Sequence, residues 1–334
     1  MKTTQVAVLI PYFQRQPGIL QATVRSVLAQ QGCDDYAIII VDDGAPVSAV
    51  SEMATLTPRE RAKVHIIEQA NAGPSAARNR ALAEVPADTT YIALLDSDDA
   101  LEPCYLATAV AALERGYDLF FGNSVRCGVE GTRFEWHTAT GATLDPAAHR
   151  LLDETVPLYE FQGDFFDFIV HRSNIIGPSS LMYRHTVGVG VRYHERIRIG
   201  EDRIFKLQLC RRVEKVVFSP RICAREGRGV NIFDSAQWGS EQALALLADY
   251  LAMNHFILRE IPLNPAQRAH VRAHLNSTRY SFVASLLHHL HQGIRIDWPL
   301  VGRTLVSDPG MLPRLVPNLL QVIATKLRHR SPTE

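Results

Sequence analysis

The sequence has few cysteines, and they form no recognisable pair. Five cysteines are scattered along 334 residues without a C-x-x-C spacing, which argues against a disulfide framework and against a zinc knuckle. The chain also lacks G-x-S-x-G, G-x-x-x-x-G-K and G-x-G-x-x-G. The sequence therefore lacks the usual markers of serine hydrolases, P-loop NTPases and dinucleotide oxidoreductases.

The chain has neither a net charge nor a long apolar run. Lys and Arg together number 35, as do Asp and Glu, so no overall field would attract nucleic acid. No uncharged stretch approaches the length of a membrane span, and the apolar run before Pro11 is too short for a signal peptide. We expect a cytoplasmic protein without nucleic-acid partners, and a peripheral position at the inner face of the cell membrane also fits.

Up to about residue 125, short apolar runs alternate with helical periodicity. Strands are predicted at 6–10, 36–44, 64–69 and 91–95, and helices at 19–31 and 73–85. Strands that are apolar throughout and separated by helices indicate an α/β fold with a parallel sheet covered on both faces.

The later part of the chain has a less regular pattern and then becomes helical. Strands are predicted at 118–127, 132–138, 179–184 and 215–219, and helices at 164–172 and 200–212. Beyond about residue 234 only long helical patterns remain. We expect a catalytic domain at 1–233, with halves at about 1–125 and 126–233, and a helical C-terminal region at 234–334.

Three carboxylates follow the predicted strand at 91–95: Asp96, Asp98 and Asp99. Two such charges about 5 Å apart repel by roughly 3 kcal/mol at an effective dielectric constant near 20. One of them could cap a helix, but three beside a buried strand favour a site for a divalent cation or a diphosphate.

Other polar residues stand at the ends of neighbouring predicted strands, where ligands collect in parallel sheets. The first strand leads into Pro11 and Tyr12, and the second into Asp42 and Asp43. Asp-Asp-Gly also suits a simple turn. Paired with the second acidic strand end, it becomes a plausible contact for a base or a ribose.

Two helix beginnings carry charges. Arg78 and Arg80 lie in the first turns of a predicted helix, where a cation gains nothing from the helix dipole; either one reaches an anion or a base, or both face solvent. Glu201 and Asp202 begin another helix, where the dipole would stabilise them. They also form a second acidic pair that could face the first across a cleft.

Five segments resemble motifs of the inverting family 2 glycosyltransferases: VAVLIPYFQR, VDDGAP, NAGPSAARNRAL, LLDSDDALEP and RYHERIRIGEDRIFKLQL. Their order and approximate spacing also match, over roughly Val6 to Gly229. The resemblance implies a GT-A-type fold, with a nucleotide-binding, mostly parallel sheet flanked by helices. It also implies transfer of a sugar from a nucleotide diphosphate sugar, with UDP as the expected nucleotide.

Residue by residue, the resemblance implies a donor site at the strand ends. Pro11 and Tyr12 would border the nucleotide, Asp42 and Asp43 would contact the uracil or ribose, and Arg78 would lie near the base. Tyr12 departs from the small residue usual in the family, so the pocket around the base is expected to differ.

The resemblance also implies a metal and a base. Asp96 and Asp98 would form the D-x-D pair, with Asp96 beside the ribose and Asp98 holding Mn²⁺ or Mg²⁺ on the diphosphate. Asp202 would be the general base, and Glu201 would orient the acceptor. With one base and no nucleophile, a single displacement with inversion is expected.

Relatives often place a His or Arg near the diphosphate. This chain has REGRG at the corresponding position, so Arg225 or Arg228 could take that role.

The acceptor that the resemblance implies is a hydroxyl of a saccharide or lipid-linked oligosaccharide in surface polysaccharide synthesis. Residues 315–330 form an apolar helical pattern that ends in basic residues; it would pack on the catalytic domain, on a second subunit, or on an anionic membrane. Two alternatives are a sugar nucleotidyltransferase and a non-catalytic scaffold that binds nucleotide sugar or polysaccharide. Nucleotidyltransferases usually have a Gly-rich, Arg-containing loop after the first strand, and the segment PYFQRQPG of this chain matches that loop poorly.

Overall fold

The computed structural model describes residues 5–136, 143–227, 236–313 and 316–317. The chain divides into two compact units. Unit 1 comprises Met1–Arg196 and Asp202–Val230, and unit 2 comprises Ile197–Glu201 and Asn231–Glu334. Unit 2 therefore includes a short segment from the middle of the sequence.

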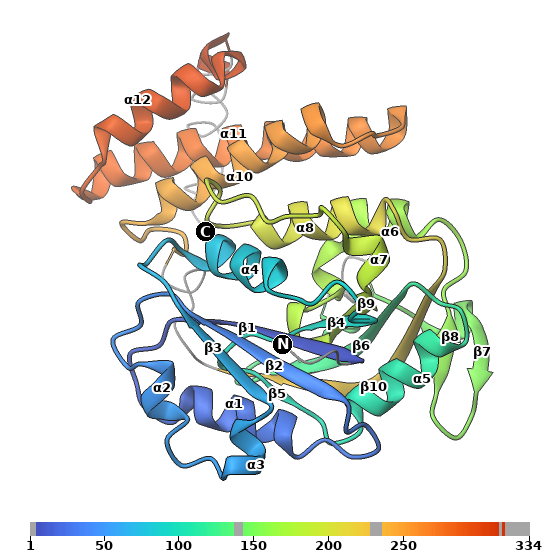
Figure 1. The fold of residues 1–334 in the computed structure, drawn as a ribbon. Helices are drawn as coiled ribbons and strands as arrows, with labels where there is room; N and C mark the ends of the chain where they lie inside the picture. Colours follow the sequence, from blue (N-terminus) through green and yellow to red (C-terminus); the bar gives the residue numbers. More distant parts are fainter. Residues whose placement is uncertain (1–4, 137–142, 228–235, 314–315, 318–334) are drawn as a thin grey trace, which may run out of the picture. The chain divides into compact units, whose positions relative to one another are not determined.

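Unit 1 is built on one mixed sheet (Figure 1). Within the described residues its strands follow the order β3-β2-β1-β4-β9-β6-β10-β8-β7, and β5 pairs with β10. The strands are β1 (Val6–Tyr12), β2 (Tyr36–Asp42), β3 (Val64–Glu68), β4 (Tyr91–Leu94), β5 (Ala100–Leu101), β6 (Leu119–Arg126), β7 (Arg150–Asp153), β8 (Leu158–Glu160), β9 (Leu181–Arg184) and β10 (Val216–Glu226).

The strand directions bring many carboxyl ends to one edge of the sheet. Strands β1, β2, β3 and β4 are parallel. Strand β9 is antiparallel to both β4 and β6, and β6 is parallel to β10, so β6 and β10 run in the same direction as β1. The chain after β2, β4 and β10 therefore emerges at the same edge, together with the residues that precede β9.

Helices cover both faces of this sheet (Figure 1). In unit 1 they are α1 (Ile19–Leu28), α2 (Ala49–Glu52), α3 (Pro58–Arg61), α4 (Pro74–Ala83), α5 (Tyr105–Glu114), α6 (Phe165–Arg172), α7 (His185–Gly188) and most of α8 (Glu201–Cys210), with 3₁₀ turns at Pro146–Ala148, Ser173–Ile175 and Pro178–Ser180. Helices α1 and α5 lie on one face, and α4, α6 and α8 on the other. The predicted α/β fold is confirmed.

The core follows the alternation of strand side chains. Val6, Val8 and Ile10 of β1 pack in a cluster with Leu20 and Val24 of α1. Residues at alternate positions of a strand point to opposite faces, and all seven residues of β2 are buried. Burial on both faces explains why these strands are apolar throughout.

The strand predicted at 132–138 is wrong for its described part, because residues 133–136 form a turn. The Arg133 N–H donates to the Ser124 carbonyl at 2.8 Å, which folds this segment back onto β6. The polar and apolar alternation has another origin. Phe134 packs on Phe121 and Phe218, while the Arg133 guanidinium binds a carboxylate.

Unit 2 is helical in its described residues. It contains α10 (Ala243–Glu260), α11 (Pro265–Gln292), α12 (Trp298–Ser307) and a 3₁₀ turn at Pro309–Met311. Its core includes Leu251, Phe282 and Met311. The buried Arg279 and Asp308 side chains form an ion pair at 2.5 Å. Of the predicted helix at 315–330, all but residues 316–317 lies outside the described ranges.

No helix in the described part of the chain has both the length and the apolar composition needed to cross a bilayer. The longest of them, α11, has 28 residues but carries charged and polar side chains along its length.

Candidate functional site

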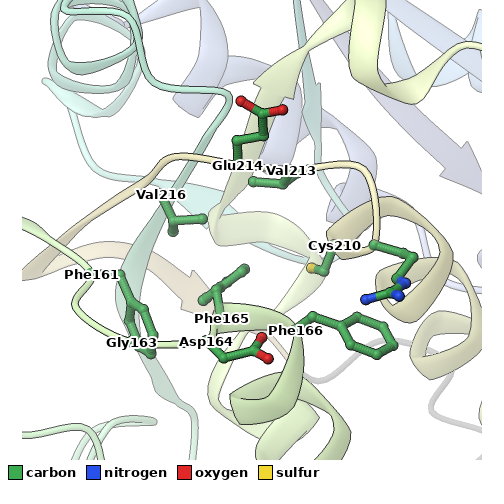
Figure 2. A pocket seen from close by; sticks show the side chains of 10 residues that line it. Phe161, Gly163, Asp164, Phe165, Phe166, Cys210, Val213, Glu214 and Val216 are labelled. Carbon is green, nitrogen blue, oxygen red and sulfur yellow. The ribbon is translucent and has the colours of Figure 1, made fainter. Parts of the chain in front are cut away.

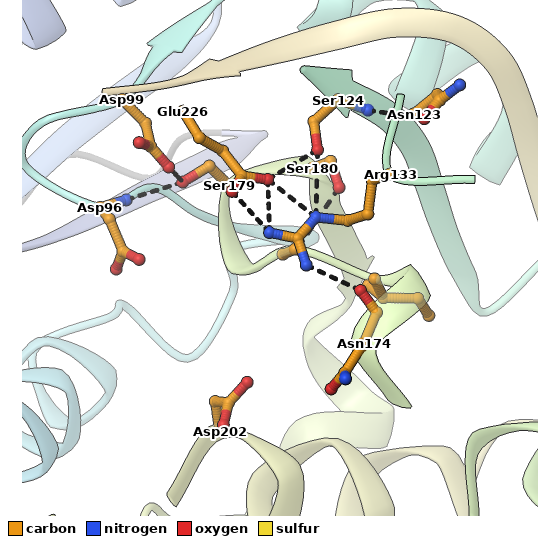
Figure 3. A network of polar contacts seen from close by, with 12 residues as sticks. Asp96, Asp99, Asn123, Ser124, Arg133, Asn174, Ser179, Ser180, Asp202 and Glu226 are labelled. Atoms are coloured by element: carbon orange, nitrogen blue, oxygen red, sulfur yellow. Dashed lines mark hydrogen bonds and ion pairs between the residues drawn. The ribbon is translucent and has the colours of Figure 1, made fainter. Parts of the chain in front are cut away.

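The loop after β4 places three carboxylates at the carboxyl edge of the sheet. Asp99 is 6% exposed, and its Oδ1 accepts from the Gly227 N–H at 2.9 Å. Its Oδ2 accepts from the Ser179 hydroxyl, whose oxygen in turn accepts from the Asp96 N–H at 3.0 Å (Figure 3). Burial, followed by the charges of Asp96 and Asp98, raises the pKa of Asp99 well above its usual value.

The end of β10 lies directly against this loop. A Cβ atom on Gly227 would come within 1.9 Å of the Asp98 carbonyl oxygen, so only glycine allows this approach. The two segments are more than a hundred residues apart in sequence. Their contact explains why a Gly-rich stretch follows β10.

Helix α4 brings a cation to the acidic loop. The Arg78 guanidinium donates to Asp96 Oδ1 at 2.7 Å, and the two side chains are 12% and 29% exposed. The same guanidinium lies 5.2 Å from the centre of the Tyr193 ring. Arg78 thus contacts a carboxylate and an aromatic ring in a largely buried position.

The next residue of α4, Asn79, holds the segment that carries Tyr193. Its Nδ2 donates to the Tyr193 carbonyl at 3.0 Å, and its Oδ1 accepts from the Tyr193 N–H at 2.8 Å. The Tyr193 ring stacks on Phe205 of α8, with centroids 4.1 Å apart. Arg78 therefore contacts the acidic loop, while its neighbour Asn79 contacts the segment before α8.

Asp202 lies in the first turn of α8 and contacts a buried lysine. Its Oδ2 is 3.0 Å from the Lys206 ammonium, which also donates to the carbonyls of Ser173 and Ile176 at 2.9 and 3.0 Å. Desolvation raises the pKa of Asp202, but the charges of Lys206 and Arg78 outweigh it and leave the pKa below its usual value.

Tyr193 lies between the Arg78–Asp96 ion pair and the helix that carries Asp202. The Arg78 guanidinium lies over its ring, and the other contact of the ring is the stack on Phe205 of α8. Burial raises the pKa of Tyr193 well above its usual value, Arg78 opposes that rise, and the charges of Asp96 and Asp202 add to it.

Asp42 and Asp43 are buried and bind backbone. The Asp42 carboxylate accepts from the N–H groups of Ala45 and Ala49, both at 2.8 Å. The Asp43 carboxylate accepts from the N–H groups of Ala72 and Gly73, both at 2.8 Å. These bonds shape the turn after β2 and the loop that leads into α4, at the same sheet edge as the acidic loop.

Pro11 and Tyr12 end β1, opposite Val41 and Asp42 of β2. The Tyr12 hydroxyl donates to the Val47 carbonyl at 2.7 Å, and Tyr12 is 1% exposed. Burial, with the nearby charges of Glu52 and Asp42, raises the pKa of Tyr12. Pro11 is partly buried.

Sequence reasoning missed a buried ion pair between Arg133 and Glu226 (Figure 3). The guanidinium donates to both Glu226 oxygens at 2.5 and 2.6 Å, and to the Asn174 carbonyl at 2.7 Å. The Ser124 hydroxyl donates to Glu226 at 2.7 Å. Both residues of the pair are about one-eighth exposed. No local sequence signal marks this pair, because Arg133 is closely followed by Glu135, and Glu226 is flanked by Arg225 and Gly227.

The remaining predicted residues differ in their surroundings. Glu201 is 9% exposed in the first turn of α8. Arg225 is exposed and pairs with Glu102 at 2.6 Å. Arg228 lies outside the described ranges.

The described residues of unit 1 include the linings of two hollows. One, of about 220 Å³, lies between the start of α6, the end of α8 and the start of β10, and is lined by Phe161, Gly163, Asp164, Phe165, Phe166, Cys210, Arg211, Val213, Glu214 and Val216 (Figure 2). The other, of about 570 Å³, is lined by Asn79, Arg192, Tyr193, His194, Glu195 and Arg196. The second adjoins the candidate site through Tyr193 and Asn79.

The acidic loop suits a hard cation by its chemistry. Among the described residues no three His, Cys, Asp or Glu side chains form a complete metal cage. Mg²⁺ typically binds through one or two carboxylates together with substrate phosphates. Asp96 and Asp98 offer two carboxylates on one loop, so the residues fit Mg²⁺ or Mn²⁺ when a diphosphate supplies the other oxygens.

Comparisons with known proteins agree with this fold. The model of "Glycosyl transferase family 2" matches residues 7–184, which is more than half of the chain. The succinoglycan biosynthesis protein ExoW of Rhizobium meliloti (strain 1021) is 26% identical over 310 residues, which covers 92% of this chain and 95% of ExoW.

Solved structures show a similar fold. Residues 1–349 of S. aureus TarS, in complex with UDP, match with a TM-score of 0.58 and 13% identity, over 98% of this chain and 93% of that one. The mannosyltransferase PcManGT of Pyrobaculum calidifontis, in complex with GDP-Man and Mn²⁺, matches with a TM-score of 0.51 and 12% identity, over 98% of this chain and 88% of that one. In a further TarS crystal structure the match spans 44% of the longer TarS chain.

Proposed function

The chain belongs to glycosyl transferase family 2, and from this premise we propose that it is a metal-dependent, inverting glycosyltransferase. The donor is a nucleotide diphosphate sugar, with UDP as the nucleotide. The acceptor is a hydroxyl of a saccharide or lipid-linked oligosaccharide in surface polysaccharide synthesis. The observation that carries this proposal is the Arg78–Asp96 ion pair beside Tyr193, whose ring stacks on Phe205 of α8, the helix that carries Asp202, because a transferase must bring a donor site and a base together.

The proposed site for the donor nucleotide sugar lies at the carboxyl ends of the strands. Arg78 and Asp96 meet the base and ribose end of the nucleotide, beside the turn shaped by Asp42 and Asp43. Pro11 and Tyr12 border the same edge. The UDP bound in the TarS fragment supports the choice of nucleotide. The ExoW likeness supports polysaccharide synthesis.

A divalent ion, Mn²⁺ or Mg²⁺, would be held by Asp98 with Asp96 and would neutralise the charge that develops on the departing diphosphate. The Mn²⁺ in the PcManGT complex supports this assignment. Asp99 is held within the protein by hydrogen bonds from the Ser179 hydroxyl and the Gly227 N–H.

The acceptor side uses Asp202. In a single displacement the acceptor oxygen bonds to the anomeric carbon, the bond from that carbon to the diphosphate breaks, and its electron pair leaves with the diphosphate. The proton of the acceptor hydroxyl passes to the Asp202 carboxylate. The lowered pKa keeps this carboxylate ionised at neutral pH, and Lys206 fixes one of its oxygens. Glu201, next to it, orients the acceptor.

The C-terminal helices bear on the protein's partners and its location in the cell. We assign the catalytic part to residues 1–233 and the helical part to 234–334. The helical part contacts either an anionic membrane surface or a second copy of the chain, and the protein works in the cytoplasm at the inner face of the cell membrane. Exposed apolar side chains on and after α12, such as Val306 at 82% exposed, support a contact of this kind.

The test begins with calorimetric titration of UDP into the wild type, Asp98→Ala and the control Asp145→Ala, with and without Mn²⁺. Asp145 caps an exposed turn, outside the candidate site. We expect binding that needs Mn²⁺, is lost in Asp98→Ala and is kept in the control. Equal UDP affinity of Asp98→Ala and the wild type would contradict the metal assignment.

Transfer is then measured as UDP released from UDP-sugars in the presence of saccharide acceptors. Asp202→Asn should bind UDP normally and lose at least about 100-fold in turnover, because general base catalysis contributes that much. Full turnover in Asp202→Asn would refute the base assignment. A wild type that binds UDP but releases none from any UDP-sugar would favour a binding scaffold.

A further inference from the structure

One serine hydroxyl binds both ends of the turn that contains Asp96 and Asp98. The Asp99 N–H donates to the Asp96 carbonyl at 3.1 Å, so residues 96–99 form a hydrogen-bonded β-turn. The Ser179 hydroxyl oxygen accepts from the Asp96 N–H at 3.0 Å, and the hydroxyl donates to Asp99 Oδ2 (Figure 3). Ser179 therefore contacts the first and the last residue of the turn at the same time.

Both of these hydrogen bonds depend on the hydroxyl of Ser179. A hydroxyl can donate and accept at a single atom, and here it does both. Ser179 is 2% exposed, so water has little room to replace the group. Without the hydroxyl the Asp96 N–H would lose its acceptor, and an unpaired buried polar group is unfavourable.

The segment before Ser179 is held by two basic side chains. The Lys206 ammonium donates to two carbonyls of residues 173–176, at 2.9 and 3.0 Å, and the Arg133 guanidinium donates to a third at 2.7 Å. Lys206 is 4% exposed, and the Arg133 side chain is 13% exposed. These contacts give the backbone that leads to Ser179 a defined position in unit 1.

Other contacts hold the turn at Ser97 and at Asp99. The Gln14 amide donates to the Ser97 hydroxyl at 3.1 Å, and the Thr23 hydroxyl donates to the Ser97 carbonyl at 3.0 Å. The Gly227 N–H binds the second oxygen of Asp99. The Asp96 N–H, in contrast, is bound by the Ser179 hydroxyl, which also connects it to Asp99.

We propose that Ser179 is a positioning residue for the divalent ion. By binding both ends of the turn, it fixes the spacing of the two carboxylates that would hold the ion, Asp96 and Asp98. This inference rests on the proposed function, in which these carboxylates bind Mn²⁺ or Mg²⁺ together with a diphosphate. Mg²⁺ demands near-ideal octahedral geometry, so a small displacement of either carboxylate weakens its binding.

The test compares Ser179→Ala and Ser179→Cys with the control Ser180→Ala. Ser180 is 1% exposed, and its hydroxyl donates to the Gly177 carbonyl at 3.3 Å, within its own turn. The control therefore removes an equally buried hydroxyl from the next residue of the same segment. Cysteine retains a side chain of similar size, but its thiol is a weaker donor and acceptor.

Three quantities are measured. Electron paramagnetic resonance of free Mn²⁺ gives the Mn²⁺ concentration that half-saturates the protein in excess UDP. Calorimetry gives the UDP affinity in saturating Mn²⁺. Hydrogen exchange of the metal-free protein reports on the peptide that contains residues 96–99, where a weaker hydrogen bond exposes the Asp96 N–H more often.

For Ser179→Ala we expect the half-saturating Mn²⁺ concentration to rise about 10- to 100-fold, as is typical when a residue that orients a metal ligand is removed. Exchange should be faster, and UDP affinity in saturating Mn²⁺ should stay close to that of the wild type. Ser179→Cys should show a smaller shift, and it decides the test if the alanine variant does not fold. Ser180→Ala should match the wild type in all three measurements.

The recovery of UDP affinity in saturating Mn²⁺ separates positioning from a general loss of structure, because excess metal would not restore a disrupted site. A wild-type half-saturating concentration in the folded Ser179 variants would overturn the inference, whether or not exchange changes. An equal shift in Ser180→Ala would also overturn it, since packing of the segment would then be the cause. If the wild type itself showed no Mn²⁺-dependent UDP binding, the proposed function would be refuted, and this inference with it.

Discussion

At the scale of single residues, the carboxylates that the sequence singled out differ in what surrounds them. Asp42 and Asp43 bind backbone N–H groups, whereas Asp96 and Asp202 meet the cations Arg78 and Lys206. The sequence predicted that Asp42, Asp43 and Asp96 gather at one sheet edge, because the carboxyl ends of parallel strands lie together, and that Asp202 faces them across a cleft. It could not reveal their partners, which come from segments far along the chain.

Tyr193 and Lys206 show most clearly what cannot be predicted from the sequence. Both look like ordinary members of amphipathic segments, and neither was selected from the sequence. Tyr193 is central because Asn79 holds its backbone and Phe205 supports its ring. Lys206 matters because its ammonium is buried with three oxygen partners. Such roles depend on tertiary contacts that no local pattern encodes.

One residue-scale prediction concerns Asp249 and pH. Its pKa is about 6 in the folded protein, against about 3.9 for an unperturbed Asp. Between about pH 4 and pH 6 the folded state holds a proton that the unfolded state has released, so stability falls as pH rises through this window, by about 3 kcal/mol at most. The side chain in Asp249→Asn cannot titrate, so the variant should lack this pH-dependent loss of unfolding free energy.

Urea unfolding at pH 4.5 and pH 7.5 provides the measurement. The variant and the wild type should have similar free energies of unfolding at the lower pH, and the variant should be the more stable at the higher pH. A constant difference between them at both pH values would show that Asp249 titrates in its ordinary range.

At the scale of elements, the strands of the first half were predictable because they are buried on both faces and therefore continuously apolar. Strand β10 was predicted only to Ser219, since Pro220 suggests an end. It continues to Glu226 because the register with β6 shifts between Ser219 and Ile222, and an irregularity of this kind tolerates proline. This continuation carries Glu226 and Gly227 to the acidic loop.

The contact between β10 and the acidic loop leads to a prediction for Gly227→Ala. The added Cβ would lie 1.9 Å from the Asp98 carbonyl oxygen, so the loop must move away from β10. We expect at least about a tenfold loss of UDP affinity in Mn²⁺, which corresponds to about 1.4 kcal/mol. Calorimetry measures it.

Gly302→Ala is the matched control. Gly302 lies in α12 with open space at its Cβ position, so its replacement should leave UDP affinity unchanged. Wild-type affinity in Gly227→Ala would mean that the position of the loop does not affect nucleotide binding.

At the scale of the whole molecule, the sequence predicted a helical C-terminal region from the change in periodicity after about residue 234. It did not predict that Ile197–Glu201 belongs to the same unit. That membership depends on contacts such as that of Gly200 with Met253, about fifty residues further along the chain. Periodicity describes which face of an element is buried, but not which element covers it.

The whole-molecule prediction concerns membrane contact. Trp298 and Val306 of α12 are 56% and 82% exposed. If this surface rests on an anionic membrane, the protein should float with anionic vesicles, less so at high salt and less so in the double variant Trp298→Ser, Val306→Ser. The control Val189→Ser changes an apolar side chain of similar exposure in unit 1 and should float like the wild type.

Sedimentation of the same proteins without vesicles tests the alternative, in which this surface contacts a second copy of the chain. A dimer that the double variant converts to a monomer, with no flotation of the wild type, would assign the surface to a second copy of the chain.

The interruption of unit 1 by Ile197–Glu201 has a consequence for how such proteins can be recombined. A chimera that exchanged only the residues after 231 between two relatives would join α10 of one parent to the segment before Asp202 of the other. Met253 would then meet a foreign backbone at Gly200. Exchanging the helical unit intact requires a second crossover around residues 197–201, so this unit is encoded by two separate pieces of gene.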